Sequence, residues 1–477
     1  MKIKRISVIL KSFTIILTCI FFFACRGKSV KTGMLVATEA PGNIRNRDYS
    51  SSEYPRHYQG TRIIAFNPDK PAIVKVLTEE FYSACFPDIS WDASHMLFTA
   101  QQKTGDPWQI WEMDLHNLRT RKIISSAENC TDPAYLPGGR LVFSKMTMND
   151  TVRTALCLYT CNLDGSDVRQ ITFGPQAYSA TKLLKDGRLL SISSQLIPDG
   201  GGRMLTVLRP DGTKADMFYK ADEGNLLISK PGETNDGRLA FIESDGEDPT
   251  KGDLITISYN RPLHTRVNLT SETREDLNCV LPLSPDRYLV SYRNPDSEKF
   301  ALYEFDPVKK AFGQLIFSDP DYNILDVVAV EEYESPKKLP SEVDMGVKTG
   351  LLLCQDINLP DFWGKEYFPG VRKARKIEVL GVDTTYGVVR VEDDGSFYLK
   401  VMADTPFRIR TLDENDNVVK GPCTWLWLRP NERRGCVGCH EDPELVPENR
   451  VSLSVKKQPV IIPVDVRKIK EKGVELE

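Results

Sequence analysis

From about Tyr58 onward, short apolar runs alternate with polar turns in a pattern that repeats along the chain. The clearest copies are Gly139-Arg140-Leu141-Val142-Phe143, Gly187-Arg188-Leu189-Leu190 and Gly237-Arg238-Leu239-Ala240-Phe241. Looser copies surround positions 96 and 288, and the anchors 96, 140, 188, 238 and 288 are 44 to 50 residues apart. Asp-Gly turns between apolar runs predict hairpins, because glycine tolerates the positive φ of tight turns. The region is therefore expected to consist of consecutive short strands.

A period of about 40 to 50 residues with about four short strands is typical of a β-propeller blade. We predict a six-bladed β-propeller over residues 57–360, with five blades in order from Phe86 to Ser318. Both ends of this region are expected to close the last blade, because closure leaves no free sheet edge. Residues 324–330 and 350–356 would supply its first two strands, and residues 62–69 and 72–77 its last two.

Strand signals resume after a proline- and aromatic-rich passage at residues 359–363. Four short runs with intervening turns predict a small β-sandwich-like module within residues 365–477. These runs are Arg375–Val382, Gly387–Val391, Ser396–Val401 and Phe407–Leu412, and a polar tail follows from Glu441. The predicted fold class is therefore all-β.

The first 24 residues predict a secretory signal peptide, in which four basic residues precede an apolar run from Ile15 to Ala24. Cys25 follows the small Ala24, where a bacterial lipoprotein is cut and acylated, although Phe22 is larger than usual there. The alternative is an ordinary signal peptide with an incidental cysteine. Residues 25–56 are polar and predict a flexible tether. We expect an exported protein, anchored in the bacterial envelope by lipid on Cys25, at the outer membrane and facing the periplasm or the surface.

The charge balance argues against a nucleic-acid partner. The formal net charge is -4, and removal of the four positive charges in residues 1–24 takes it to -8. A mildly acidic surface fits neither nucleic acid nor a basic membrane-binding patch. Seven of the eleven cysteines lie outside the signal, Cys25 and the C-terminal motif, mostly in apolar runs. There they are expected to be small buried hydrophobes.

The strongest chemical signal is Cys436-Val437-Gly438-Cys439-His440, the pattern of covalent c-type haem attachment. Two thiols three positions apart reach two vinyl groups, and His440 follows directly as a ligand for the haem iron. In the alternative, Cys436 and Cys439 form a disulfide or bind zinc with His440 and another thiol. Arg429, Arg433 and Arg434 are expected to pair with haem propionates or to be solvated. Trp425 and Trp427 are expected to belong to a core or to a haem pocket.

Two families resemble parts of this chain. Phe86-Pro87-Asp88-Ile89-Ser90-Trp91-Asp92 and Trp108-Gln109-Ile110-Trp111-Glu112-Met113-Asp114 resemble the PD40/TolB-type propeller repeats, which implies the fold of residues 60–360. Three further segments resemble the α-subunit family of hydrazine synthase, in its propeller and haem-bearing middle domain: residues 391–398, 403–407 and 433–441. This resemblance implies a haem site at Cys436, Cys439 and His440, and warns that the motif histidine need not be the axial ligand. The synthase subunit continues into a further haem domain, so we do not expect complete hydrazine synthesis here.

The leading hypothesis is a lipid-anchored protein with one haem c that transfers electrons or senses small ligands, while the propeller binds a protein partner. The second is a propeller scaffold without haem, with zinc or a disulfide at the C-terminal cysteines. The third is an enzyme that uses propeller-face residues. No catalytic residue can be named from the sequence, and a cluster of carboxylates or histidines at the central channel would favour this third hypothesis.

Overall fold

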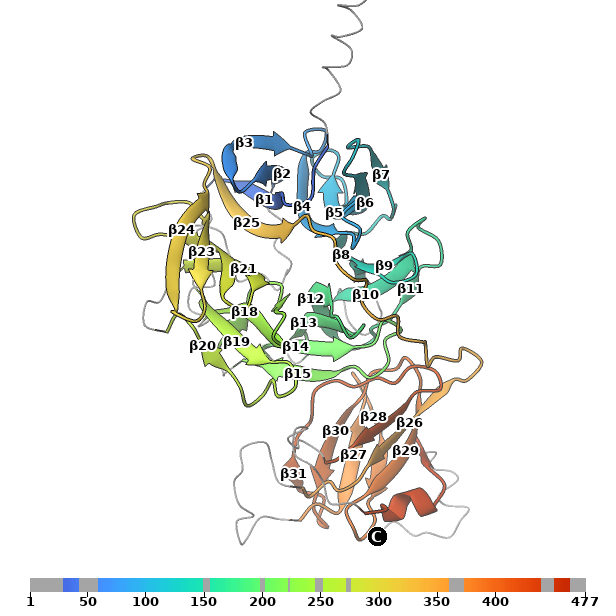
Figure 1. Ribbon diagram of the computed structural model, residues 1–477. Helices are drawn as coiled ribbons and strands as arrows, with labels where there is room; N and C mark the ends of the chain where they lie inside the picture. Colours follow the sequence, from blue (N-terminus) through green and yellow to red (C-terminus); the bar gives the residue numbers. More distant parts are fainter. Residues whose placement is uncertain are drawn as a thin grey trace, which may run out of the picture.

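The computed structural model describes residues 29–42, 59–148, 155–197, 202–221, 224–244, 252–271, 276–359, 373–438 and 450–463. In these ranges the strands form eight sheets, of which six draw all their strands from Leu35–Ala329. These six sheets follow one another around a ring, and the remaining two form a separate module beside it (Figure 1). The all-β prediction and the propeller are thereby confirmed. Among the described residues, no helix has the length and apolar character needed to cross a bilayer.

Five sheets of the ring form from consecutive strands, as the repeat predicts. Their strands are β4 (Ser83–Ile89), β5 (His95–Gln101), β6 (Gln109–Asp114) and β7 (Thr120–Lys122); β8 (Cys130–Leu136), β9 (Arg140–Thr147), β10 (Ala155–Asn162) and β11 (Arg169–Gln170); β12 (Gln176–Leu183), β13 (Leu189–Gln195), β14 (Arg203–Leu208) and β15 (Asp216–Lys220); β16 (Leu226–Leu227), β17 (Gly232–Glu233), β18 (Arg238–Ser244), β19 (Asp253–Ser258) and β20 (Val267–Asn268); and β21 (Asp276–Ser284), β22 (Arg287–Arg293), β23 (Ala301–Asp306) and β24 (Ala311–Phe317). The anchor positions of the repeat begin or lie within β5, β9, β18 and β22, or lie just before β13.

The sixth sheet has the order β25 (Tyr322–Ala329), β1 (Leu35–Pro41), β2 (Arg62–Asn67) and β3 (Lys70–Val76), so residues from both ends do close the ring. The prediction of a tether over residues 25–56 is wrong for β1. Six of its seven residues are buried, and Leu35 pairs with Phe66 on one side and Ala329 on the other. The prediction that residues 350–356 join this sheet is also wrong, because they belong to the second module. An apolar run shows that a strand forms but not which sheet it joins.

The second module consists of two four-stranded sheets packed around a common core. One sheet has the order β32 (Arg433–Cys436), β26 (Thr349–Cys354), β29 (Phe397–Met402) and β33 (Val460–Ile461); the other has β28 (Thr385–Arg390), β27 (Lys376–Leu380), β30 (Arg408–Leu412) and β31 (Val418–Lys420), and the 3-10 helix η2 (Leu453–Lys456) lies near β29. Leu352 and Leu399 from the first sheet pack in one cluster with Ile377 and Ile409 from the second. The four strands predicted after residue 375 form, and β26 adds a strand from the region assigned to the propeller.

The inner strands of four ring sheets, β4, β8, β12 and β21, each contain a bulge at a corresponding place. In three of them the bulge holds a residue at positive φ: Phe86 at 57°, Asp132 at 53° and Ala180 at 51°. A bulge redirects side chains by adding one residue to a strand. Here the bulged segments line a cavity at the ring centre, which places polar groups from separate sheets within reach of one another.

Candidate functional site

The first half of the haem motif is held by strand pairing. Strand β32 runs parallel to β26, with Cys436 in register with Cys354. Pairing continues past the strand end, because the backbone N–H of Gln355 donates to the carbonyl of Cys436 at 3.0 Å and that of Asp356 to the carbonyl of Val437 at 3.1 Å. The backbone that carries the first motif thiol is therefore fixed. Cys439 and His440 lie outside the described residues.

The Cys436 side chain lies at the edge of the module core. It is half-buried and packs against the cluster that contains the fully buried Cys354. Cys423 packs against the same cluster, and burial raises the pKa of its thiol to about 11. The structure thus places Cys354 directly beside Cys436, whereas Cys423 contacts Ile409 on the other sheet. In the part of the chain that the structure describes, no group of three or more His, Cys, Asp or Glu side chains is positioned to hold a metal ion.

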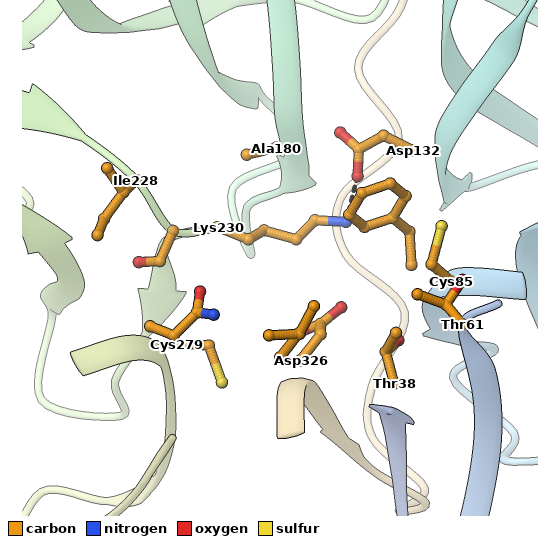
Figure 2. Close-up of a pocket in the computed structure, with 13 residues that line it drawn as sticks. Thr38, Thr61, Cys85, Asp132, Ala180, Ile228, Lys230, Cys279 and Asp326 are labelled. Carbon is orange, nitrogen blue, oxygen red and sulfur yellow. Dashed lines mark hydrogen bonds and ion pairs between the residues drawn. The ribbon is translucent and has the colours of Figure 1, made fainter. Parts of the chain in front are cut away.

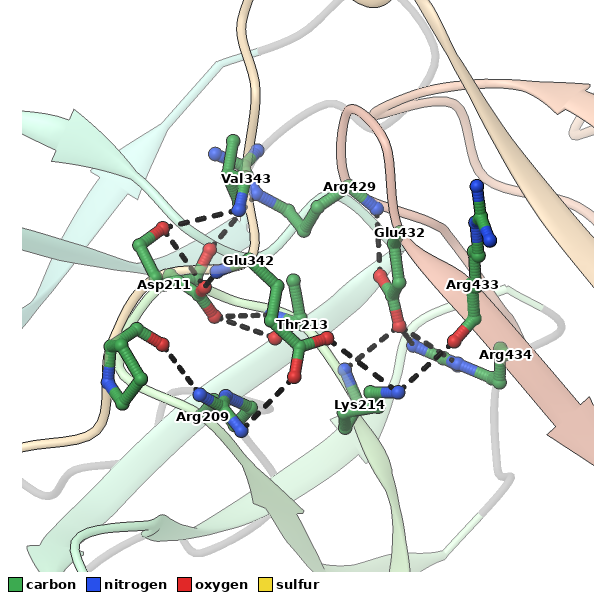
Figure 3. A network of polar contacts seen from close by, with 12 residues as sticks. Arg209, Asp211, Thr213, Lys214, Glu342, Val343, Arg429, Glu432, Arg433 and Arg434 are labelled. Atoms are coloured by element: carbon green, nitrogen blue, oxygen red, sulfur yellow. Dashed lines mark hydrogen bonds and ion pairs between the residues drawn. The ribbon is translucent and has the colours of Figure 1, made fainter.

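Glu432, immediately before β32, joins the module to the propeller (Figure 3). Its side chain is fully buried and accepts hydrogen bonds from the backbone N–H of Lys214 at 2.8 Å and of Arg429 at 2.8 Å. It also forms an ion pair with Arg434 at 2.8 Å. Lys214 belongs to the loop between β14 and β15, so one carboxylate fixes the start of β32 against the ring. This contact determines where the motif lies relative to the propeller.

Two of the three arginines before the motif bind protein groups and are not solvated. Arg429 is buried, pairs with Asp404 at 2.6 Å and donates to the carbonyl of Asp211 at 3.0 Å. Arg434 pairs with Glu432 and donates to the carbonyl of Ala215 at 3.0 Å. Only exposed Arg433 keeps the solvated character expected of a charge cluster. Buried Arg429 and partly buried Arg434 are thus docking residues that protein groups engage, and not solvated ones. The pairing of these arginines with haem propionates stays a prediction.

Trp425 and Trp427 lie in the interface between module and ring. The indole N–H of Trp425 donates to the carbonyl of Ile197 at 2.6 Å. Trp427 is 2% exposed and belongs to a cluster of propeller side chains, where its ring meets Tyr178 edge to face at 6.3 Å. The expectation of an ordinary core is therefore correct, but the core is shared between the two modules.

The propeller cysteines are buried hydrophobes, as predicted. Cys85, Cys130, Cys157, Cys161 and Cys279 are all buried. Burial raises the pKa of the Cys130 thiol to about 12, that of Cys157 to about 11 and that of Cys161 to about 12. Because the thiolate is the reactive form, these side chains are poor nucleophiles.

A cluster of polar residues around a cavity at the ring centre could not be recognised from the sequence. A cavity of about 70 Å³ is lined by residues from the inner part of the sheets, including Thr38, Asp132, Lys230 and Asp326 (Figure 2). Lys230 reaches across to Asp132, with Nζ at 3.3 Å from Oδ1. Thr38 and Asp326 are paired neighbours on β1 and β25 of the closing sheet, whereas Asp132 comes from β8 and Lys230 from the connection between β16 and β17. These segments are far apart in the chain, so no local motif joins them. The only signal in the sequence is the blade repeat itself, because the bulges of the inner strands are seen only in the structure.

Burial raises the pKa of Asp326 to about 6, although Lys230 and Lys182 lower it, and Asp132 adds to the rise. The thiols of Cys85 and Cys279 also lie close enough to feel this carboxylate. Because the pKa of Asp326 is higher in the folded protein than in the unfolded chain, the fold favours the protonated acid. The resulting stabilisation is complete below the unfolded pKa of about 4 and is lost as the pH rises through the folded pKa of about 6. At neutral pH the charged Asp326 therefore costs stability.

We expect Asp326→Asn to increase the free energy of unfolding by roughly 1–3 kcal/mol at pH 8 and by less at pH 5, because the amide removes the buried charge. Urea unfolding of both proteins at the two pH values measures this. Asp69→Asn on the exposed surface is the control and should change neither value. A gain that is equal at both pH values would contradict the assignment.

The comparisons with known proteins agree with the resemblance in the sequence. Residues 364–441 match the family described as hydrazine synthase alpha subunit middle domain. The chain is 22% identical over 535 residues to hydrazine synthase subunit alpha of Kuenenia stuttgartiensis, an alignment that covers 85% of this chain and 65% of that subunit. The chain therefore spans slightly less than two thirds of the length of that relative.

One solved structure gives the same result for the fold. Kuenenia stuttgartiensis hydrazine synthase matches with a TM-score of 0.76 at 21% identity, over 91% of this chain and 72% of that chain. TolB from Acinetobacter baumannii matches with a TM-score of 0.41 at 14% identity, over 61% of this chain and 65% of that chain. The resemblance to the hydrazine synthase α-subunit family is thus confirmed in sequence and in fold, and residues 364–441 match the middle domain of that family.

Proposed function

We propose that this chain is an exported, lipid-anchored envelope protein that binds one haem c at Cys436, Cys439 and His440, with a six-bladed propeller as its partner-binding platform. The observation that supports this most is the match of residues 364–441 to the middle domain, a range that includes the complete motif. The six sheets of the ring are taken as the six blades.

The described half of the motif fits haem attachment. Cys436 is only partly buried, and its backbone is fixed by β26. A Cβ built on the preceding Gly435 would meet no atom within 4 Å, so there is open space beside the strand. Cys436 and Cys439 would hold the group by thioether bonds, and His440 would face the iron. A bound haem would supply one-electron transfer or small-ligand binding, depending on its axial ligands.

The propeller suits a protein partner. The relative from Kuenenia stuttgartiensis is named as a subunit of hydrazine synthase, so a protein partner on the propeller face is a consistent proposal here. The synthase activity itself is not part of the proposal, because the chain spans 65% of that subunit. The net charge of -4 continues to argue against nucleic acid.

A second candidate is a scaffold without haem, in which the C-terminal cysteines bind zinc or form a disulfide. The structure supplies the additional thiol that this alternative requires, since Cys354 lies in register with Cys436. Zinc without iron in the exported protein would favour it.

Substitution of the motif cysteines tests the haem proposal. We expect that Cys436→Ser and Cys439→Ser, made separately, each reduce haem-dependent peroxidase staining of the denatured chain to a residual single-thioether signal, and that the double variant abolishes it. Cys423→Ser is the matched control, because this thiol packs on the same core outside the motif. It should stain like the unmodified protein. Equal staining of all four variants would exclude covalent attachment at the motif.

The lipid anchor is tested by Cys25→Ser. Acyl chains on Cys25 would keep the mature protein with membranes, since two or more chains give stable anchoring. We expect the variant to move from the membrane fraction to the soluble periplasmic or secreted fraction, as followed by fractionation and by metabolic labelling with a fatty acid. Labelling that persists in the variant would place the anchor elsewhere.

A further inference from the structure

Cys354 and Cys436 are direct neighbours across two parallel strands. The register of β26 and β32 runs from Leu351 opposite Arg433 to Cys354 opposite Cys436. Neighbouring strands lie about 4.8 Å apart. Disulfides join residues whose Cα atoms are about 4.4–6.8 Å apart. The backbone spacing at this pair is therefore compatible with a disulfide.

The two side chains also point toward the same side of the sheet. Cys354 belongs to the core cluster of the module, and Cys436 packs against that cluster. Cys354 is fully buried, as is Leu352 two residues earlier, whereas the intervening Leu353 is half-buried. Cys436 is the less buried member of this pair. The thiol that would attach haem thus belongs to the partly exposed residue of the two.

We propose that Cys354 and Cys436 form a reversible disulfide that competes with haem attachment at Cys436. This inference rests on the proposed haem site. It assigns Cys354 as a redox partner of the motif, and makes attachment depend on the thiol–disulfide state of the compartment.

The exchange requires a protein disulfide of the thiol–disulfide oxidoreductase class. The deprotonated Cys436 sulfur attacks one sulfur of that disulfide, forming a mixed disulfide and releasing one partner thiolate. The deprotonated Cys354 sulfur then attacks Cys436, which forms the intramolecular bond and releases the second partner thiolate. The two protons from Cys354 and Cys436 pass to the two partner sulfurs, so two cysteines are oxidised and one disulfide is reduced.

Haem attachment needs a different state of the same sulfur. Thioether formation adds the S–H of a cysteine across a vinyl double bond, with sulfur joining one carbon and hydrogen the other, and uses no oxidant. A Cys436 sulfur already bonded to Cys354 has no S–H to add. Oxidation of the pair therefore blocks attachment at the first thiol until the bond is reduced.

The geometry favours a bond that is easily reduced. In-register neighbours on parallel strands keep their Cβ atoms near the strand spacing of about 4.8 Å. Disulfides prefer about 3.5–4.5 Å between Cβ atoms, so closure needs a shift of a few tenths of an ångström. Strained disulfides have higher reduction potentials than relaxed structural ones. The bond is thus suited to a transient protective role.

The test uses the full chain, exported to the periplasm of a host with haem-attachment machinery, with and without haem supply. In unmodified protein made without haem, non-reducing peptide mapping should find Cys354 linked to Cys436. With haem supplied in an oxidising host, Cys354→Ala should carry at least about twofold more covalent haem per chain than unmodified protein. Cys423→Ala is the matched control and should change neither result, because its sulfur accepts the Ile409 N–H at 3.2 Å on the other sheet.

Separate readouts distinguish this inference from the haem proposal. If haem attaches normally but no linked peptide forms and Cys354→Ala gains nothing, the disulfide is wrong while the haem site stands. If no variant binds haem but the linked peptide is found, the haem site is wrong, and with it the competition. If Cys354→Ala fails to fold, Cys354→Val replaces it, because valine fills the same buried position. This variant should then also carry at least about twofold more covalent haem per chain than the unmodified protein.

Discussion

Glu432→Ala is expected to release the C-terminal module from the propeller, with a loss of about 3–5 kcal/mol in the free energy of unfolding of the docked chain. The reason is that one fully buried carboxylate compensates Arg434 and two backbone N–H groups, those of Lys214 and Arg429. Removing it leaves a nearly buried guanidinium without its counter-charge. Arg434 is 11% exposed, so solvent replaces little of the lost interaction.

Urea unfolding followed by tryptophan fluorescence measures this loss, because Trp425 and Trp427 report on the same interface. The control is Glu392→Ala, which breaks an ion pair with Lys457, whose side chain is 66% exposed. Exposed pairs contribute less than about 1 kcal/mol. Similar losses in the two variants would mean that Glu432 is not the residue that holds the module.

Trp427→Ala is expected to have an effect of the same size in the same interface. Its ring is inserted among propeller residues that include Leu158, Ile171 and Tyr178. A Cβ built on Gly174 would lie 3.4 Å from this ring, which shows how closely the loop before β12 packs on it. Deleting a buried tryptophan side chain costs about 3–5 kcal/mol.

Equilibrium unfolding and limited proteolysis of the connection at residues 330–348 test this prediction. Trp427→Phe should lose much less, since it keeps most of the apolar contact and the indole N–H has no hydrogen-bond partner among the described residues. Because Trp427 and Glu432 lie in one interface, their effects should not add. Unchanged proteolysis of Trp427→Ala would contradict a docking role.

Much of the fold could be predicted because blades are local structures. Each blade is encoded within about 50 residues, so its turns and apolar runs repeat visibly. Gly187, for example, adopts a φ of +90° at the turn predicted to precede β13. The closing sheet was predicted in part only, because pairing of β1 with β25 joins residues about 290 positions apart. Local pattern contains no information on such pairing, which is why the prediction put residues 350–356 in the closing sheet and treated the segment of β1 as a tether.

The same limit applies to the site. Cys436, Cys439 and His440 form a local motif and could be recognised directly. The residues that surround this motif could not be recognised. Glu432 binds the backbone of Lys214 in the propeller, and Cys354 lies beside Cys436 only because β26 and β32 pair in that register. Arg429 and Arg434 were misread because a basic cluster in sequence does not reveal that Asp404 and Glu432 neutralise it in space. Likewise, Asp132, Lys230 and Asp326 come together only when the ring closes.

The measurement that tests the central claim most directly is a pyridine haemochrome spectrum, with iron and zinc analysis, of the full chain exported with haem-attachment machinery. One haem per chain that stays with the polypeptide through acid–acetone extraction is the predicted result, with iron and haem in equal amounts. A chain that carries zinc or no metal, and shows no haemochrome bands after such expression, would contradict the claim that Cys436-Val437-Gly438-Cys439-His440 binds haem.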